Sequence, residues 1–184
     1  MTSDGSSQSL AGKLLLAMPC LKETSFARRV VYLSEHDVNE GAFGLILNEP
    51  TGKRLHHFLE GENFDALRDV PVFVGGPVAV DQVTFASLKW NSKSGLKCQL
   101  RISLEKAMRE LEQPGRRVHA FLGYSGWSPG QLEGELARRS WHVMKASSPA
   151  LATDHEPILW KSLMQSGSAI QRILADAPDH PLLN

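Results

Sequence analysis

The hydrophobic positions of the chain fall into short runs of strand length, separated by polar turns. These runs are rich in β-branched and aromatic residues, which suit a pleated and partly buried surface. We expect strands at Leu14–Met18, Val30–Ser34, Phe43–Asn48, Val70–Val74, Val80–Leu88, Arg117–Leu122 and Ser140–Met144. The turn Asn39-Glu40-Gly41 is short enough to predict an antiparallel pair from the two strands that flank it.

Helices are expected where apolar residues recur every three or four positions. Ser103 is a good N-cap for a helix whose apolar residues lie at positions 104, 107, 108 and 111. Further helical spacing runs from Leu55 to Gly61 and from Pro157 to Ala175, where a break near Gly167 predicts two short helices. We expect a turn or short helix at residues 24–29, a polar loop at residues 90–97 and a linker at residues 147–154.

Strands in pairs with interspersed helices favour an α+β fold with a mixed, largely antiparallel sheet and helices packed on it. A three-layer α/β arrangement is the alternative. The length of 184 residues fits a single compact domain, and no internal repeat or low-complexity linker divides the chain. Residues 1–12 are expected to form a flexible tail, and residues 13–184 the domain, including the C-terminal helices.

The stretch Gly123–Leu136 carries the densest set of unusual residues. Gly123 is expected to end the strand at residues 117–122 and to open a loop. Ser128 as N-cap, with Gln131 three positions later, predicts a capping box and a helix that starts at residue 129. Glycine recurs at positions 126, 130 and 134, which indicates a close approach by a neighbouring element or a ligand. We interpret the stretch as a strand-to-helix corner that displays Tyr124 and Trp127.

This corner leaves two chemical alternatives open. A glycine-rich loop before a helix can bind a phosphate, but Pro129 has no N–H and no Walker or G-x-G-x-x-G pattern is present. The order Gly123-Tyr124-Ser125-Gly126 approaches the nucleophile elbow of serine hydrolases, yet its second glycine is one position early. Neither pattern is complete.

Other candidate residues lie at the ends of predicted strands. Glu35-His36-Asp37 could bind a metal or move protons, although neighbouring residues of a strand point to opposite faces and cannot converge. Gly75-Gly76-Pro77 predicts a sharp bend that could form a second pocket wall. His56-His57 cannot chelate one metal from a regular helix. The candidate ligand or partner surface therefore comprises Glu35, His36, Asn48, Gly75, Gly76, Tyr124, Ser125, Trp127 and Gln131, with no catalytic set, metal or cofactor assigned.

Composition and charge argue against nucleic acid and membranes as direct partners of the protein. The formal net charge is +0 and the pI is about 7.1, so no global basic field favours direct binding to nucleic acid. The cysteines Cys20 and Cys98 form no C-x-x-C or metal-type cluster, which indicates a reducing compartment. No signal peptide and no apolar run of membrane-spanning length is visible. The sequence predicts a cytoplasmic protein without a membrane partner.

Several of these stretches resemble the bacterial YqgE/AlgH family. The matching pieces are LLLAMP from Leu14, VVYLSEH from Val30, GAFGLILNEP from Gly41, VFVGGPV from Val72 and FLGYSGWSPGQLEGEL from Phe121. The resemblance covers roughly residues 14–144, and the C-terminal helices match only loosely. It implies a mixed α and β domain of bacterial, cytoplasmic type and a label as a transcriptional regulator.

The resemblance supplies no catalytic residues, and the family's pattern often has alanine at the position of Ser125. No helix-turn-helix or basic face is visible in the sequence. The first hypothesis is thus a regulatory or interaction protein that acts through a protein or small-molecule partner, on transcription only indirectly. The alternatives are a hydrolase-like small-molecule enzyme, with a pocket near Gly75-Gly76 and residues 124–128, and a direct DNA-binding regulator.

Overall fold

The computed structural model describes residues 9–21, 24–59, 61–148, 151 and 156–176. The strands are β1 (Lys13–Ala17), β2 (Val30–Asp37), β3 (Gly41–Ile46), β4 (Pro50–Arg54), β5 (Pro71–Val74), β6 (Val78–Asn91), β7 (Gly95–Ile102), β8 (Arg116–Trp127) and β9 (Trp141–Lys145). The α-helices are α1 (Leu104–Leu111), α2 (Gln131–Ala137), α3 (Glu156–Gln165) and α4 (Ala169–Ala175). Short 3-10 turns are η1 (Pro19–Leu21), η2 (Leu55–His57) and η3 (Glu62–Leu67).

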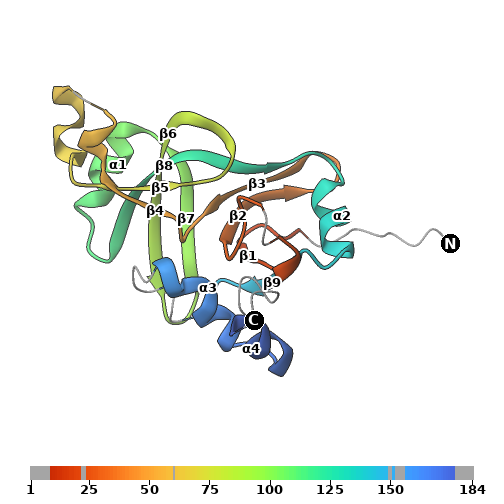
Figure 1. The fold of residues 1–184 in the computed structure, drawn as a ribbon. Helices are drawn as coiled ribbons and strands as arrows, with labels where there is room; N and C mark the ends of the chain where they lie inside the picture. Colours follow the sequence, from red (N-terminus) through yellow and green to blue (C-terminus); the bar gives the residue numbers. More distant parts are fainter. Residues whose placement is uncertain (1–8, 22–23, 60, 149–150, 152–155, 177–184) are drawn as a thin grey trace, which may run out of the picture.

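All the strands belong to one mixed sheet in the order β4-β5-β8-β3-β2-β1-β9, with β6 paired to β8 and β7 paired to β6 (Figure 1). The β5–β8 pair is parallel, and the other strand pairs of the described residues are antiparallel. This sheet confirms the predicted α+β class, and the β2–β3 pair confirms the predicted hairpin. The C-terminal pair of short helices is also confirmed, with the break at residues 166–168.

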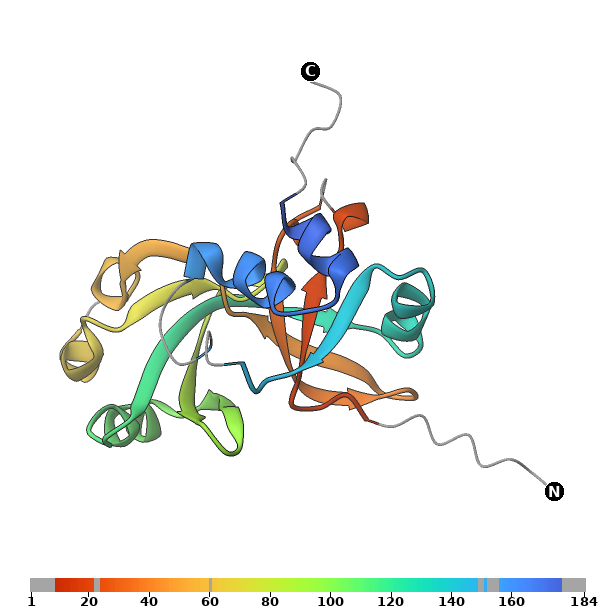
Figure 2. The same ribbon diagram turned by 90° about the horizontal axis from the view of Figure 1, so that it is seen from below.

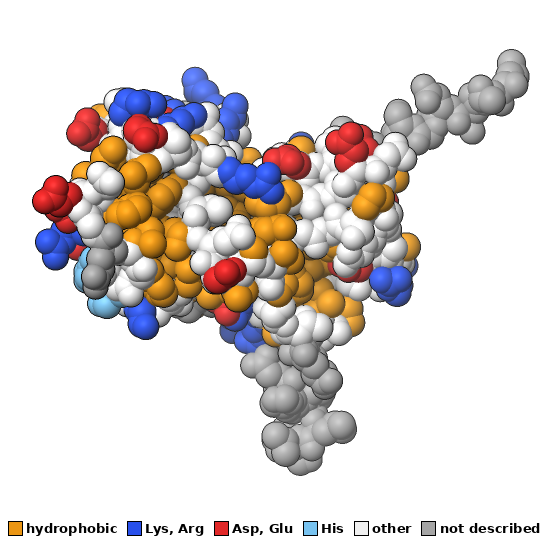
Figure 3. Space-filling view, turned by 90° about the horizontal axis from the view of Figure 1, so that it is seen from above, with side chains coloured by type: hydrophobic (Ala, Val, Ile, Leu, Met, Phe, Trp, Pro, Cys, Tyr) orange, Lys and Arg blue, Asp and Glu red, His pale blue; other side chains and the backbone are white. Residues whose placement is uncertain are grey.

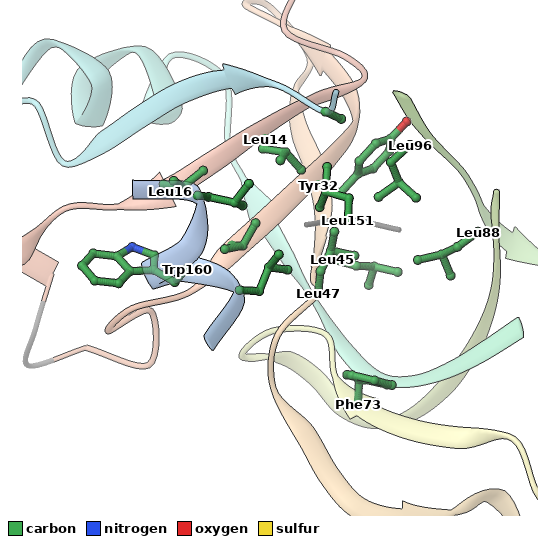
Figure 4. Close-up of a cluster of buried hydrophobic side chains, with 14 of the residues drawn as sticks. Leu14, Leu16, Tyr32, Leu45, Leu47, Phe73, Leu88, Leu96, Leu151 and Trp160 are labelled. Carbon is green, nitrogen blue, oxygen red and sulfur yellow. The ribbon is translucent and has the colours of Figure 1, made fainter. Parts of the chain in front are cut away.

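The sheet curls until two of its three edges, those at β7 and β9, meet. The Leu96 amide of β7 donates to the carbonyl oxygen of Ala146, which follows β9, at 2.6 Å. The resulting interior holds the largest hydrophobic cluster, whose leucines, Tyr32 and Phe73 point toward one another from several strands (Figure 4). Helix α3 contributes Trp160, whose indole N–H donates to the Ala17 carbonyl oxygen at 2.9 Å. The core is thus a nearly closed barrel with a helix as part of its wall.

Helices cover the outside of the sheet at its two ends. Helix α1, with η2 and η3, lies at one end, α2 lies at the other, and α3 and α4 lie together near the C-terminus (Figures 1 and 2). A second apolar cluster, around Val72 and Ala120, packs under α1, and a third, around Val31 and Trp127, packs under α2. Among the described residues, none of the helices combines the length and hydropathy needed to cross a membrane.

Three sequence-based predictions differ from the fold. Residues 50–54 form strand β4 instead of leading directly into a helix, and the predicted helix from Leu55 is a single 3-10 turn. The predicted loop at residues 90–97 is a tight hairpin in which β6 runs to Asn91 and β7 begins at Gly95. Strand β4 has the sequence PTGKR, which offers no apolar alternation, and among the described strands it pairs only with β5.

Candidate functional site

The central stretch is a strand where the sequence predicted a loop. Strand β8 runs through Gly123 to Trp127, because Gly123 adopts a φ of 66° and bends the strand without ending it. Helix α2 begins at Gln131 after Gly130 in the left-handed conformation, so the predicted Ser128 cap and start at residue 129 are wrong. Half of the predicted capping box is present, because the Ser128 amide donates to Gln131 Oε1 at 3.1 Å.

The two glycine bends lie against each other. The Gly75 amide donates to the Leu122 carbonyl oxygen at 2.8 Å. A Cβ atom on Gly76 would lie 2.3 Å from the carbonyl carbon of Tyr124, and one on Gly75 would lie 2.4 Å from the carbonyl oxygen of Gly123. The bends are therefore packed backbone to backbone, and no ligand fits between them. The predicted pair of pocket walls is wrong in this respect.

Ser125 lies inside this backbone contact. Its side chain is fully buried, and its hydroxyl donates to the Gly75 carbonyl oxygen at 3.1 Å. A nucleophilic serine needs an accessible oxygen with a base in hydrogen-bond reach. The hydroxyl of Ser125 instead closes a turn, which gives it a structural role.

Trp127 is buried, which corrects the prediction that the corner displays it. Its indole packs against Phe26 and Trp141, with ring centroids 6.2 and 5.9 Å away. The Oε2 atom of Glu135 accepts the indole N–H groups of both Trp127 and Trp141, at 2.9 and 2.7 Å. Gln131 is exposed and donates to Glu135 Oε1 at 3.0 Å. These side chains fasten α2 to the sheet.

Glycine within α2 has no close neighbour. A Cβ atom on Gly134 would meet only the guanidinium of Arg138, at 3.5 Å. The predicted close approach to the glycine face of α2 is thus wrong. Gly126, in contrast, packs against the ring of Tyr124, whose Cε2 atom lies 3.0 Å from the position that a Cβ atom on Gly126 would take.

Asn48 and His36 are both engaged inside the protein. Asn48 is buried, accepts from the Val30 amide at 2.8 Å and donates to the Arg28 carbonyl oxygen at 2.9 Å. His36 Nδ1 lies 3.1 Å from the Leu10 amide, and His36 Nε2 lies 2.8 Å from Glu133 Oε1. Because the Leu10 amide is a donor, Nδ1 accepts and Nε2 carries the proton, an assignment made from the hydrogen-bond pattern.

Two residues of the predicted flexible tail, Ser9 and Leu10, form hydrogen bonds with His36. Ser9 Oγ donates to the His36 carbonyl oxygen at 2.9 Å, so residues 9 and 10 are bonded to the end of β2. Residues 1–8 of the predicted tail lie outside the described residues. Within the described part of the chain, no group of three or more His, Cys, Asp or Glu side chains could hold a metal ion.

A different set of residues meets where the start of β3 pairs with the end of β8. The rings of Phe43 and Tyr124 are in contact, with centroids 4.9 Å apart. The guanidinium of Arg101 lies over the Phe43 ring, 3.7 Å from its centroid. Register places Glu35 opposite Phe43 and Val78 opposite Tyr124. We call these five residues the aromatic surface.

Two of the four non-glycine residues with positive φ in the described structure lie at or beside the aromatic surface, and the other two, Arg28 and Arg139, lie elsewhere. Arg101 and Ala79 are non-glycine residues with φ values of 51° and 50°. Arg101 lies where the β6–β7 register shifts, and Ala79 lies in the longer shift of β6 against β8. That second shift leaves Val78 and Val80 38% and 58% exposed. Strain in non-glycine residues persists where the surrounding structure enforces it, and it is often found at functional sites.

A depression of 440 Å³ opens beside the aromatic surface. It is lined by Glu35, His36, Asp37, Glu40, Gly41, Ala42 and Phe43 of the β2–β3 hairpin. Hydrophobic side chains also form a continuous band across one face of the molecule (Figure 3). The structure thus brings together Glu35 and Tyr124 from the predicted candidates, and adds Phe43, Arg101 and Val78. Their proximity depends on strand register and bulges, which a single sequence does not show.

The two cysteines lie in different surroundings. Cys20 is exposed, whereas Cys98 packs against the barrel interior, where burial raises the pKa of its thiol far above the usual range. Cys98 retains partial solvent exposure, so we expect the native protein to react rapidly with one equivalent of a thiol reagent at pH 8 and much more slowly with a second. Cys20→Ser should abolish the rapid phase; a rapid phase that persists in this variant would contradict the assignment.

Comparison with known proteins places the chain in a family. A profile described as AlgH-like matches residues 14–169. A UPF0301 protein of Streptomyces coelicolor is 33% identical over 96% of both chains, and one of Chlorobium phaeobacteroides is 34% identical over 95% of both.

Solved structures show the same relationship. The solution structure of the AlgH protein from Pseudomonas aeruginosa has a TM-score of 0.64 and 26% identity, over 96% of this chain and 99% of that one. A crystal structure of a Corynebacterium diphtheriae protein shares the fold, with a TM-score of 0.67 and 20% identity over 93% of both chains. The chain belongs to the YqgE/AlgH family.

Proposed function

We propose that the protein is an interaction protein that binds a protein or small-molecule partner through the aromatic surface. Binding would take place in the cytoplasm, and any effect on transcription would pass through the partner. The observation that carries the proposal is the strained backbone at Ala79 and Arg101, which holds Val78 and Val80 in solvent and Arg101 on the Phe43 ring.

The aromatic surface has the composition of a binding site. Tyrosine and arginine are enriched at protein interfaces, and here the exposed Arg101 and the half-buried Tyr124 lie above the Phe43 ring, which is itself only 6% exposed. Arg101 has no ion pair with a described carboxylate, so its N–H groups are free to bind a partner. Tyr124 is half-buried, and its ring is held by Phe43 and Gly126. Such a pre-positioned surface loses little freedom on binding.

The hydrolase-like alternative has weaker support from the geometry. Ser125 is buried and bonded to a backbone carbonyl, and both ring nitrogens of His36 are engaged. Glu35 points to the opposite face of β2 from His36, as strand alternation predicts. These groups do not form a nucleophile and base pair.

The proposal is tested by site-specific crosslinking in the full chain. A photo-crosslinking residue at Val80 is expected to trap a discrete partner, because this position lies beside the aromatic surface and is 58% exposed. The matched control places the same residue at Ile170, which is 69% exposed on α4. Arg101→Ala should reduce trapping at position 80 by about fivefold or more, the effect of losing an interface anchor.

A small-molecule partner is covered by a second measurement. Fractions of a bacterial metabolite extract should raise the melting temperature of the native protein, and Arg101→Ala should remove that shift. Equal trapping at positions 80 and 170, or no trapping together with no shift dependent on Arg101, would refute the proposed surface.

A further inference from the structure

A second surface, on the opposite side of strands β6 and β7, carries an unusual concentration of basic side chains. Lys89, Lys93 and Lys97 recur at every fourth position, and no acidic residue occurs between Asp81 and Glu105. Lys89, Lys93 and Lys97 are all exposed. The neutral net charge of the whole chain hides this local excess.

Strand register aligns three of the cations in one row. Lys89 lies directly opposite Lys97 on β7 and opposite Arg116 on β8. Directly opposed residues of antiparallel strands point to the same face, and neighbouring strands lie about 4.8 Å apart. The three side chains, which we call the basic row, therefore cross the sheet over roughly 10 Å. They lie on the outer face, since the intervening Leu88 and Leu96 point into the barrel.

The basic row is only partly neutralised within the described structure. Arg116 pairs with Glu110 of α1 at 2.7 Å, but Lys89 and Lys97 have no carboxylate partner among the described residues. Like charges placed directly opposite each other destabilise a sheet. Lys89 and Lys97 thus form an unfavourable pair that an anionic partner would convert into a favourable contact.

We propose that the basic row docks a short acidic segment of a partner protein. Its span of roughly 10 Å corresponds to about three extended residues, since an extended chain advances about 3.3 Å per residue. A longer polyanion such as duplex DNA fits less well. Glu110 of α1 pairs with Arg116 at 2.7 Å and places a negative charge at that end of the row, so a long polyanion that continued past Arg116 would meet a carboxylate, whereas a segment of about three residues would not extend that far. The basic row shares no residue with the aromatic surface, so an experiment that refutes one proposal leaves the other unaffected.

Fluorescence anisotropy with a labelled decaglutamate peptide tests the proposal on the full chain. We expect binding that weakens several-fold between 50 and 200 mM salt, because exposed charges are screened over a Debye length of about 10 Å. The double variant Lys89→Gln, Lys97→Gln should bind about three- to tenfold more weakly, as loss of two exposed ion contacts predicts. The control variant Lys53→Gln, Arg138→Gln removes the same charge elsewhere and should bind within twofold of the native protein.

A single substitution separates binding from folding. Lys97→Glu should raise the urea midpoint, because it replaces a repulsive cross-strand pair with an attractive one, and should still weaken peptide binding at least as much as the double variant does. Absence of peptide binding, an equal loss in the control variant, or tighter binding of a 20-base-pair DNA duplex than of decaglutamate would each overturn the proposal.

Discussion

Glu135→Ala is expected to lower the free energy of unfolding by about 2–5 kcal/mol, one of the largest effects of any polar substitution in this chain. One oxygen of Glu135 accepts the indole N–H groups of Trp127 and Trp141, at 2.9 and 2.7 Å. Both indoles belong to residues no more than 6% exposed. Alanine would leave two buried donors without an acceptor, each of which costs about 1–3 kcal/mol.

The effect should be local to the junction of α2 with the sheet. Glu135→Gln retains one acceptor oxygen and is expected to lose only about 1 kcal/mol. Glu112→Ala removes an exposed carboxylate and should remain within about 0.5 kcal/mol of the native protein. Urea unfolding followed by circular dichroism and tryptophan fluorescence measures all three. A loss for Glu135→Ala no larger than that for Glu112→Ala would show that the indole N–H groups find other acceptors.

This junction also explains why sequence reasoning misplaced Trp127. A tryptophan in a stretch with several glycines and a serine has the composition of an exposed loop. Its burial depends on Phe26, Trp141 and Glu135, which come from three separate segments. Side-chain periodicity reports on one element at a time and contains no information about these contacts.

The parts of the fold that were predicted correctly depend on local signals. The runs at residues 14–17 and 30–33 consist of apolar and aromatic residues, and both are buried on each face of the sheet. The Ser103 cap of α1 is confirmed, because its side chain accepts from the Lys106 amide at 3.3 Å. Caps and buried strands are determined by a few neighbouring residues, and so a single sequence identifies them.

The aromatic surface shows the limit of the same reasoning. Tyr124 and Glu35 were candidates because of their own strands, but Arg101 was not, since its neighbours predicted only the entry to a helix. Arg101 reaches Phe43 because β7 folds across the barrel, where Tyr32 Oη accepts from the Cys98 amide at 3.5 Å. Contacts of this kind follow from topology, which strand patterns alone leave open.

Gly123→Ala is expected to destabilise the protein by more than about 3 kcal/mol, and it tests the packed pair of glycine bends directly. Gly123 has a φ of 66°, and a Cβ atom there would lie 2.6 Å from the carbonyl oxygens of both Gly76 and Val78. Gly115 is a matched control, because its φ is 73° and no atom lies within 4 Å of its added Cβ. Gly115→Ala should therefore show the backbone strain alone, about 1 kcal/mol.

The difference between these two variants isolates the contact between the bends from the conformational preference of glycine. Urea unfolding gives both stabilities, and the melting curve of Gly123→Ala reports whether the fold survives at all. If the bends instead enclosed a space, the methyl group would be accommodated, and the two variants would lose the same stability. A large difference means that Val78 and Val80 are held in solvent by a rigid backbone contact, the condition on which binding at the aromatic surface depends.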